Sequence, residues 1–207
     1  NRSRTYVNKI LNKISGEYYK NYKINLIKRY KENVEIFYGE KNEFFTYDKV
    51  VIATHADEAL SLLENPSEDE KKLLSNFKYK SNLAVIHTDK NQMPKNKKAW
   101  SAWNAKLHKN LIEHSSVTYW LNLLQNLKFD EDIFLSLNPF DNIEEEKILN
   151  KVTFTHPYYD KLALENQTRL KKIQNVNNTL FCGSYFGYGF HEDGITSAID
   201  MLKSFHD

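Results

Sequence analysis

The sequence predicts a mixed α/β fold, because apolar residues recur with a helical period in some segments and with a strand-like period in others. Near the N-terminus, Val7, Ile10, Leu11 and Ile14 stand at helical spacing, which predicts a helix over residues 4–15. Strand-like runs follow, and the run at 179–182 leads directly into another helical segment. Strands that pass into helices in this way are typical of α/β proteins.

A small antiparallel meander is predicted after the first helix. One strand-like stretch lies around Ile24 and Leu26, and a second alternates Val34, Ile36 and Tyr38. The segment 39–42 has turn composition and leads to a third apolar stretch at residues 44–47.

Residues 50–53 form a continuous apolar run of the kind found in buried strands. A helix is expected over residues 57–63. Ser67 and Glu70 then have the spacing of a capping box, which predicts a second helix that ends near residue 76.

The middle of the chain is richer in strands. Strand candidates are residues 83–87, 99–103, 117–121, 133–137 and 152–155. A helix over 160–173 then leads to the strand at 179–182.

Composition limits the class of protein and its partners. A hydrophobic content of 41% argues against general disorder, and a net charge of +2 from interspersed Lys and Glu gives nucleic-acid binding little support. The single cysteine, Cys182, excludes an internal disulfide and is expected to be a small buried hydrophobe. No apolar stretch approaches the roughly 18 residues of a membrane span. We therefore predict a cytoplasmic protein, with a peripheral membrane contact left open as an alternative.

The most informative segment is 183–194, which holds four of the six glycines of the chain. A strand precedes it, and a helix with an apolar stripe from Ile195 to Phe205 follows, with Asp193 at the expected N-cap. Glycines at such a junction permit close approach of the backbone, and a helix N-terminus favours electron-rich groups. One interpretation is a site for a flat or phosphate-bearing ligand. The other is a tight turn packed with aromatic residues.

Other candidate residues also have two interpretations. The small residues Ala53 and Thr54 at a strand end suit a cofactor that lies against the backbone, or a plain strand-to-helix connection. His191 could lie beside a ligand or at the surface. The aromatic residues on the middle strands either form core or wall a pocket: Trp100, Trp103, Tyr119 and Trp120. No His or Cys cluster has metal-ligand spacing, so no metal is expected.

Several segments together resemble the flavin-dependent amine oxidase superfamily, in particular its bacterial branch of predicted NAD/FAD-binding oxidoreductases. The resemblance covers nearly the whole chain, and its most specific part is residues 181–194. The other segments that carry it are 3–7, 50–57, 87–89, 93–94, 99–104, 118–122, 124–125, 137–139 and 156–157.

The resemblance implies FAD as the cofactor and a partial Rossmann-like FAD-binding domain joined to a β-rich substrate domain. Residues 1–74 would belong to the FAD-binding domain together with the N-terminal helix. Residues 75–160 would form the substrate domain, and residues 161–207 would return to the FAD-binding domain.

The resemblance also implies roles for individual residues. Gly183 and Ser184 match positions beside the ribityl chain and the pyrophosphate. Gly194 and Ile195 match a helix start whose backbone N–H groups face the flavin ring and stabilise the charge of its reduced form. The remaining expected cofactor contacts are Ile24 at the adenine, Ala53 and Thr54 near the pyrophosphate, and His191. The expected substrate pocket is lined by Trp100, Trp103, Tyr119 and Tyr185.

Two departures from the family pattern are visible. Ser184 stands where many amine oxidases carry glutamate, and no strand is followed by Gly-x-Gly-x-x-Gly. The chain therefore matches a C-terminal part of the family, and the N-terminal dinucleotide-binding segment is an expected missing partner. The implied reaction is hydride removal from a small-molecule substrate, either an amine or a lipid acyl chain. The alternative is a non-catalytic or partner-dependent fragment that does not bind flavin alone.

Overall fold

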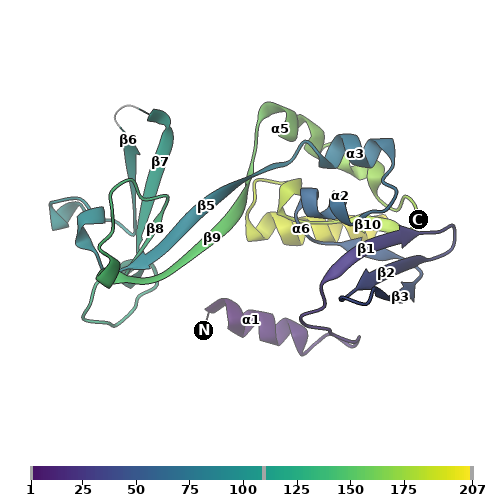
Figure 1. Cartoon of the computed structure of the whole chain (residues 1–207), viewed down its shortest axis with the longest axis horizontal. Helices are drawn as coiled ribbons and strands as arrows, with labels where there is room; N and C mark the ends of the chain where they lie inside the picture. Colours follow the sequence, from purple (N-terminus) through teal and green to yellow (C-terminus); the bar gives the residue numbers. More distant parts are fainter. Residues whose placement is uncertain (1, 109–110, 206–207) are drawn as a thin grey trace. The chain divides into compact units, whose positions relative to one another are not determined.

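The computed structural model describes residues 2–108 and 111–205 and divides the chain into two units. The first unit consists of Asn1–Phe77 and Asp160–Asp207, so the chain leaves this unit and later returns to it. The second unit is Lys78–Tyr159. Helices and three sheets are present (Figure 1), which confirms the mixed α/β class.

The predicted meander is present in the first unit. Strands β1 (Ile24–Arg29), β2 (Val34–Tyr38) and β3 (Glu43–Tyr47) form an antiparallel sheet in that order. Helix α1 (Arg2–Leu11) is shorter than predicted, because single turns replace the regular helix after Leu11 and carry the chain to Ile14.

A parallel pair of strands joins the two ends of the first unit. Strand β4 (Val50–Ile52) pairs with β10 (Thr179–Phe181), and all of β10 is buried. The run at residues 50–53 was expected to be a buried strand. This is wrong for the middle of β4, because Val51 is 40% exposed.

Besides α1, the described residues of the first unit form the helices α2 (Ala56–Leu62), α3 (Glu68–Leu74), α5 (Lys161–Gln167) and α6 (His191–Lys203), of which α6 contacts β10. The capping box is confirmed: Ser67 Oγ accepts the Glu70 N–H, and the Glu70 carboxylate accepts the Ser67 N–H at 2.7 Å. The helix predicted over 160–173 is interrupted after Gln167, and a 3₁₀ turn at Leu170–Ile173 follows, because the Arg169 N–H bonds only three residues back.

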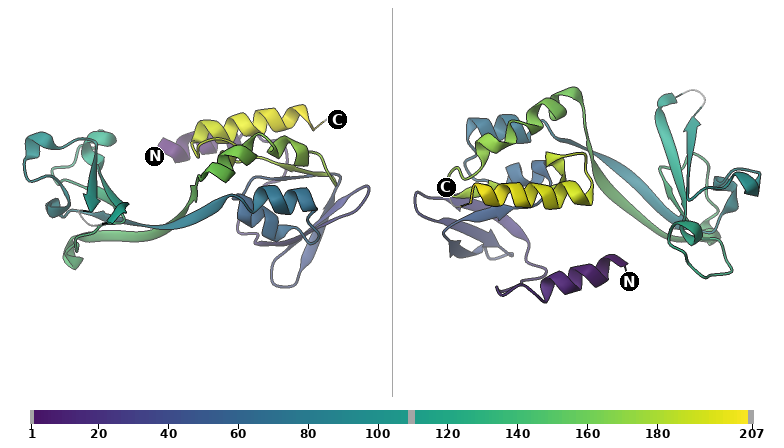
Figure 2. Two further views of the ribbon diagram at one scale, coloured as in Figure 1. Left: turned by 90° about the horizontal axis from the view of Figure 1, so that it is seen from above. Right: turned by 180° about the vertical axis from the view of Figure 1, so that it is seen from behind.

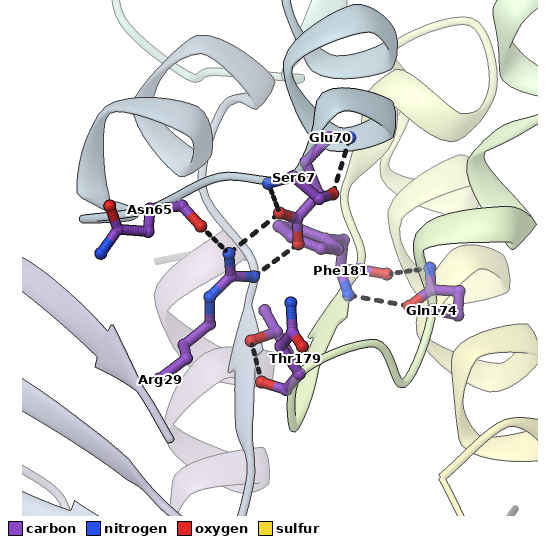
Figure 3. Close-up of polar contacts among 8 residues, drawn as sticks. Arg29, Asn65, Ser67, Glu70, Gln174, Thr179 and Phe181 are labelled. Carbon is purple, nitrogen blue, oxygen red and sulfur yellow. Dashed lines mark hydrogen bonds and ion pairs between the residues drawn. The ribbon is translucent and has the colours of Figure 1, made fainter. Parts of the chain in front are cut away.

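A buried ion pair connects the meander to α3 (Figure 3). Arg29 donates to both carboxylate oxygens of Glu70, at 2.5 and 3.0 Å, and to the Asn65 carbonyl at 2.7 Å. Burial by itself would raise the pKa of Glu70, but the hydrogen bonds from Arg29 and Ser67 outweigh it and hold this pKa below its ordinary value. Glu70 is therefore charged in the folded protein.

The second unit contains one five-stranded antiparallel sheet in the order β6–β7–β8–β5–β9. Figure 2 shows these strands with only short helical segments beside them. The strands are β5 (Lys78–His87), β6 (Trp103–His108), β7 (Leu111–Trp120), β8 (Phe134–Leu137) and β9 (Ile148–Tyr158), and the one α-helix described in this unit is α4 (Leu121–Leu124).

The strand predicted over 99–103 is wrong. Residues Lys97–Ala99 form a 3₁₀ turn capped by the Asn96 side chain, and β6 begins only at Trp103. The capping bond satisfies a backbone N–H locally and so favours a turn over an extended ladder.

Polar side chains are buried on one face of this sheet. His87 Nε2 lies 2.8 Å from Ser136 Oγ, which lies 2.7 Å from Thr118 Oγ1, and the Asp89 N–H donates to His87 Nδ1 at 3.1 Å. Because Nδ1 accepts, Nε2 carries the proton of the neutral ring and donates to Ser136. The network thus satisfies a histidine that is fully buried.

Candidate functional site

A groove of about 640 Å³ lies in the first unit where β4 and β10 end and α6 begins. This volume is within the range of small-molecule and cofactor sites, about 300–1,000 Å³. Its lining comes from four separate parts of the sequence. The lining residues are Tyr6, Ile10, Ala53, Cys182, Gly183, Ser184, His191, Glu192, Gly194, Ile195 and Ala198.

Most of the predicted cofactor contacts lie together in this groove. The predicted residues among its lining are Ala53, Gly183, Ser184, His191, Gly194 and Ile195. Thr54 is adjacent, since a Cβ placed on Gly183 would lie 3.4 Å from the Thr54 carbonyl oxygen. Ile24 is not in the groove: it begins β1, where it pairs with Tyr38. The cofactor roles of these residues stay predictions.

The loop after β10 requires glycine at its first position. Gly183 has φ 155°, a conformation that L side chains rarely adopt, and an added Cβ would lie 2.8 Å from the Tyr185 ring. The loop then turns tightly, with the Phe186 N–H bonded to the Gly183 carbonyl and the Gly189 N–H bonded to the Ser184 carbonyl. The tight-turn interpretation of the glycine cluster is confirmed, and this turn forms one wall of the groove, whereas the ligand-site interpretation stays a prediction.

Three polar side chains that the sequence analysis did not identify as site residues hold this loop. Ser197 Oγ accepts the Gly183 N–H at 2.9 Å and donates to the Gly194 carbonyl at 2.7 Å. The Asp193 carboxylate accepts the N–H groups of Tyr188 and Phe190. Gln167 donates to two loop carbonyls, those of residues 185 and 187. No local pattern identifies Gln167, because its partners lie about twenty positions away.

The start of α6 differs from the prediction. The N-cap is Phe190 and the helix begins at His191, so the expectation that Asp193 is the N-cap is wrong. Asp193 is the third helical residue, and its carboxylate reaches back to the loop N–H groups. The Gly194 N–H donates to the Phe190 carbonyl at 3.2 Å. The amides that lack an intrahelical acceptor are therefore those of residues 191–193.

Helix α1 supplies the groove wall that sequence could not predict. Tyr6 and Ile10 of α1 line the groove, and the Tyr6 hydroxyl lies 3.4 Å from His191 Nδ1. These two residues are 185 positions apart in the sequence. Apolar periodicity predicts the helix but not the element against which it lies.

Of the four predicted pocket aromatics, Tyr185 belongs to the first unit, and Trp100, Trp103 and Tyr119 belong to the second. Tyr185 is 2% exposed in the core of the first unit, where its ring contacts Phe77 and Phe186. In the second unit the Trp100 ring packs on Phe134 and its indole N–H donates to the Pro94 carbonyl. Trp103 and Tyr119 are cross-strand neighbours on β6 and β7. Tyr185 is therefore a core residue of the first unit, and Trp100 is half-buried in the second.

Cys182 is buried, as predicted, and packs with Leu180 and Met201. Burial raises the pKa of its thiol, which keeps it protonated and unsuited to be a nucleophile. Among the described residues, His, Cys, Asp and Glu side chains nowhere gather in a set of three able to hold a metal. Within 2–108 and 111–205, no helix has the length and apolar character needed to cross a bilayer.

The chain matches no protein-family model and no curated protein by sequence. Solved structures with the same architecture do exist. One is a conjugated-linoleic-acid-producing fatty acid isomerase from P. acnes, with a TM-score of 0.68 and 14% identity, covering 99% of this chain and 52% of that one. Their folds match.

Two amine oxidases are also similar to this chain in structure. Cyclohexylamine oxidase from Brevibacterium oxydans has a TM-score of 0.55 and 10% identity, with 89% of this chain and 48% of that chain covered. A cofactor-binding redesign of putrescine oxidase has a TM-score of 0.59 and 8% identity, with 97% and 52% covered. This chain thus spans about half the length of the structures it matches, and the resemblance to flavin-dependent amine oxidases is confirmed at the level of the fold.

Proposed function

We propose that this chain is part of a FAD-dependent oxidoreductase and that the groove between the strand ends and α6 is its flavin site. One observation carries the proposal: the ends of two parallel strands and the first turn of a helix line a single groove of cofactor size. Ligands of open α/β sheets bind at the carboxyl ends of the strands, and helix N-termini favour electron-rich groups.

The residues present fit such a cofactor. Ala53 and Gly183 offer little side-chain bulk at the strand ends, which lets a pyrophosphate lie against the backbone. Ile195 and Ala198 give one wall an apolar surface suited to a flat ring. The amides of residues 191–193 would donate to oxygens that carry partial negative charge. Bound FAD would supply a hydride acceptor, and the role of these residues is to position it and to exclude water.

The substrate class has two candidates. The two similar amine oxidases favour an amine, and the similar fatty acid isomerase favours a lipid acyl chain. In either case the substrate would lose a hydride from a carbon, next to nitrogen in an amine or within an alkyl chain.

We further propose that the missing dinucleotide-binding segment adds a strand at β4. The N–H of Val50 and the carbonyl of Ile52 bond to the β10 side, so Val51 directs its backbone groups to the opposite edge. Within the described residues β10 is the one strand that pairs with β4. The outer edge of β10 is already closed, because Gln174 bonds both the N–H and the carbonyl of Phe181 (Figure 3). An incoming parallel strand would therefore pair with β4.

The test is the absorbance spectrum of the purified protein with and without added FAD. We expect a flavin spectrum in roughly equimolar amount, and its loss in Ala53→Glu, which places a carboxylate against the pyrophosphate position. Ser61→Glu, on an exposed position of α2, is the matched control. If the two variants retain flavin equally, the groove is not the site.

Purified protein that shows no flavin absorbance even after FAD is added would favour the alternative, a partner-dependent fragment that does not bind flavin alone. In an assembled protein, Val51→Pro removes the N–H offered at the open edge of β4 and should lower flavin content, whereas Val51→Thr keeps that N–H and should retain it.

A further inference from the structure

The groove of the first unit brings a phenol and an imidazole from distant parts of the chain into contact. Tyr6 lies on α1, His191 begins α6, and both residues line the groove. The Tyr6 hydroxyl lies 3.4 Å from His191 Nδ1. This distance exceeds the usual length of about 2.7–3.2 Å, but catalytic hydrogen bonds are often long before substrate binds and tighten in the complex.

The contact at Nδ1 leaves the second ring nitrogen available. Within the described residues, His191 Nε2 has no hydrogen-bond partner, and the side chain is exposed at the groove. A neutral imidazole carries a proton on one nitrogen and a lone pair on the other. When Nδ1–H donates to the Tyr6 oxygen, Nε2 keeps the lone pair and can accept a proton.

The groove offers few other proton acceptors. The other lining residues of suitable chemistry are Cys182 and Glu192. Burial raises the pKa of the Cys182 thiol, which keeps it protonated. Glu192 is exposed, and no described side chain holds its carboxylate in place. Histidine is the commonest general base, and a base acts best when a neighbouring group orients it, as Tyr6 does for His191.

We propose that His191 is the general base of the reaction in this groove and that Tyr6 positions its ring. Tyr6 accepts the proton-bearing Nδ1, and Nε2 is presented to the substrate. His191 is then a catalytic residue, because it touches the substrate, and Tyr6 is a positioning residue, because it acts through His191. This proposal rests on the proposed function, since the reaction requires a flavin in the groove.

Hydride removal leaves a proton that a base must take. An amine binds as an ammonium ion, and Nε2 removes an N–H proton, so that the electron pair stays on nitrogen. When the adjacent carbon loses its hydride to the flavin, that pair forms the C=N bond. In an acyl chain the hydride leaves first, Nε2 takes a proton from the next carbon, and the C–H electron pair forms the C=C bond. His191 is exposed, so it can pass the proton to water.

The first measurement is the tautomer of His191 in the full gene product, isotope-labelled at the histidine ring nitrogens. The nitrogen chemical shifts report which atom carries the proton, and His191→Gln assigns the signals by their loss. We expect the proton on Nδ1, and we expect Tyr6→Phe to lose this preference because the acceptor oxygen is gone. Tyr18→Phe, at an exposed tyrosine outside the groove, is the matched control.

The second measurement is the rate at which flavin absorbance is lost when the protein is mixed, without oxygen, with cyclohexylamine or linoleic acid. We expect His191→Ala to lower this rate by about 100- to 10,000-fold, the usual contribution of a general base. Added imidazole should restore part of the rate, which it would not do if His191 were merely structural. His156→Ala, on β9 and outside the groove, should keep the native rate.

The outcomes separate this proposal from the proposed function. If neither the native protein nor any variant holds flavin, the proposed function fails, and the base fails with it. A proton on Nε2 in the native protein overturns the base alone, and this result needs no substrate, so it decides the matter when neither probe is oxidised. The base is also overturned if His191→Ala keeps its flavin and the native rate, or if Glu192→Gln shows the loss instead.

Discussion

At the scale of single residues, the ion pair of Arg29 and Glu70 is the most demanding feature of the first unit. Both side chains are almost fully buried, so each charge depends on the other for its stability. The carboxylate also accepts the Ser67 N–H, which ties the helix cap and the ion pair into one network. The nearby pair of Lys28 and Glu64 has similar chemistry but is about one-third exposed.

We predict that Glu70→Gln lowers the free energy of unfolding by about 3–5 kcal/mol, because it leaves the Arg29 guanidinium buried without its counter-charge. Glu64→Gln, the control at the exposed pair, should cost under about 1 kcal/mol. Urea unfolding near neutral pH measures both. Equal losses would show that the buried pair has no special role.

The same pair gives a pH dependence with a definite sign. The folded pKa of Glu70 is depressed, so its contribution to stability is present above the ordinary value of 4.5 and is lost as pH falls through the folded pKa. Glu70→Gln should lack this acid-dependent loss.

At the scale of elements, the hydrogen bonds across β5, β8 and β7 fix the sheet of the second unit from within. His87 on β5 donates to Ser136 on β8, which contacts Thr118 on β7. Burial lowers the pKa of His87, and the opposing effect of Asp89 does not cancel it. The ring is therefore neutral when folded and takes up a proton more readily when unfolded.

We predict that the second unit loses stability as pH falls below 6.5, the ordinary pKa of His, towards the lower folded pKa. The unfolded state binds the proton first, so protonation favours unfolding. Urea midpoints followed by tryptophan fluorescence on both sides of 6.5 measure the effect. His87→Gln should remove this dependence, whereas His156→Gln, on an exposed position of β9, should keep it. An unchanged slope in His87→Gln would assign the dependence to other groups.

At the scale of the whole molecule, the two units have separate cores. The core of the first unit forms around β10, with Leu180 and Phe181 fully buried, and that of the second forms around Phe134 and Val85. Chains with separate cores often depart from two-state unfolding. All three tryptophans of the chain lie in the second unit, so their fluorescence reports on that unit alone.

We predict that Glu70→Gln moves the unfolding transition seen by far-ultraviolet circular dichroism while the transition seen by tryptophan fluorescence stays in place. The substitution acts in the first unit, and the fluorescent residues belong to the second. Thermal scans with both probes provide the measurement. A parallel shift of the two curves would mean that the units unfold as one cooperative block.

The sequence by itself determined the local structure and the place of the candidate site. Periodicity located most helices and strands, the spacing of Ser67 and Glu70 specified a cap, and the glycine cluster marked the loop that forms one groove wall. These features depend on residues a few positions apart, whose interactions are visible in the chain itself.

Only the tertiary structure decided which distant residues meet. It placed Tyr6 beside His191, closed the β10 edge with Gln174 and buried Tyr185. It also moved the start of α6 to His191, because the Asp193 carboxylate caps the loop N–H groups from the third position of the helix. Contacts between distant segments depend on packing, and a single sequence does not record which apolar faces pack together.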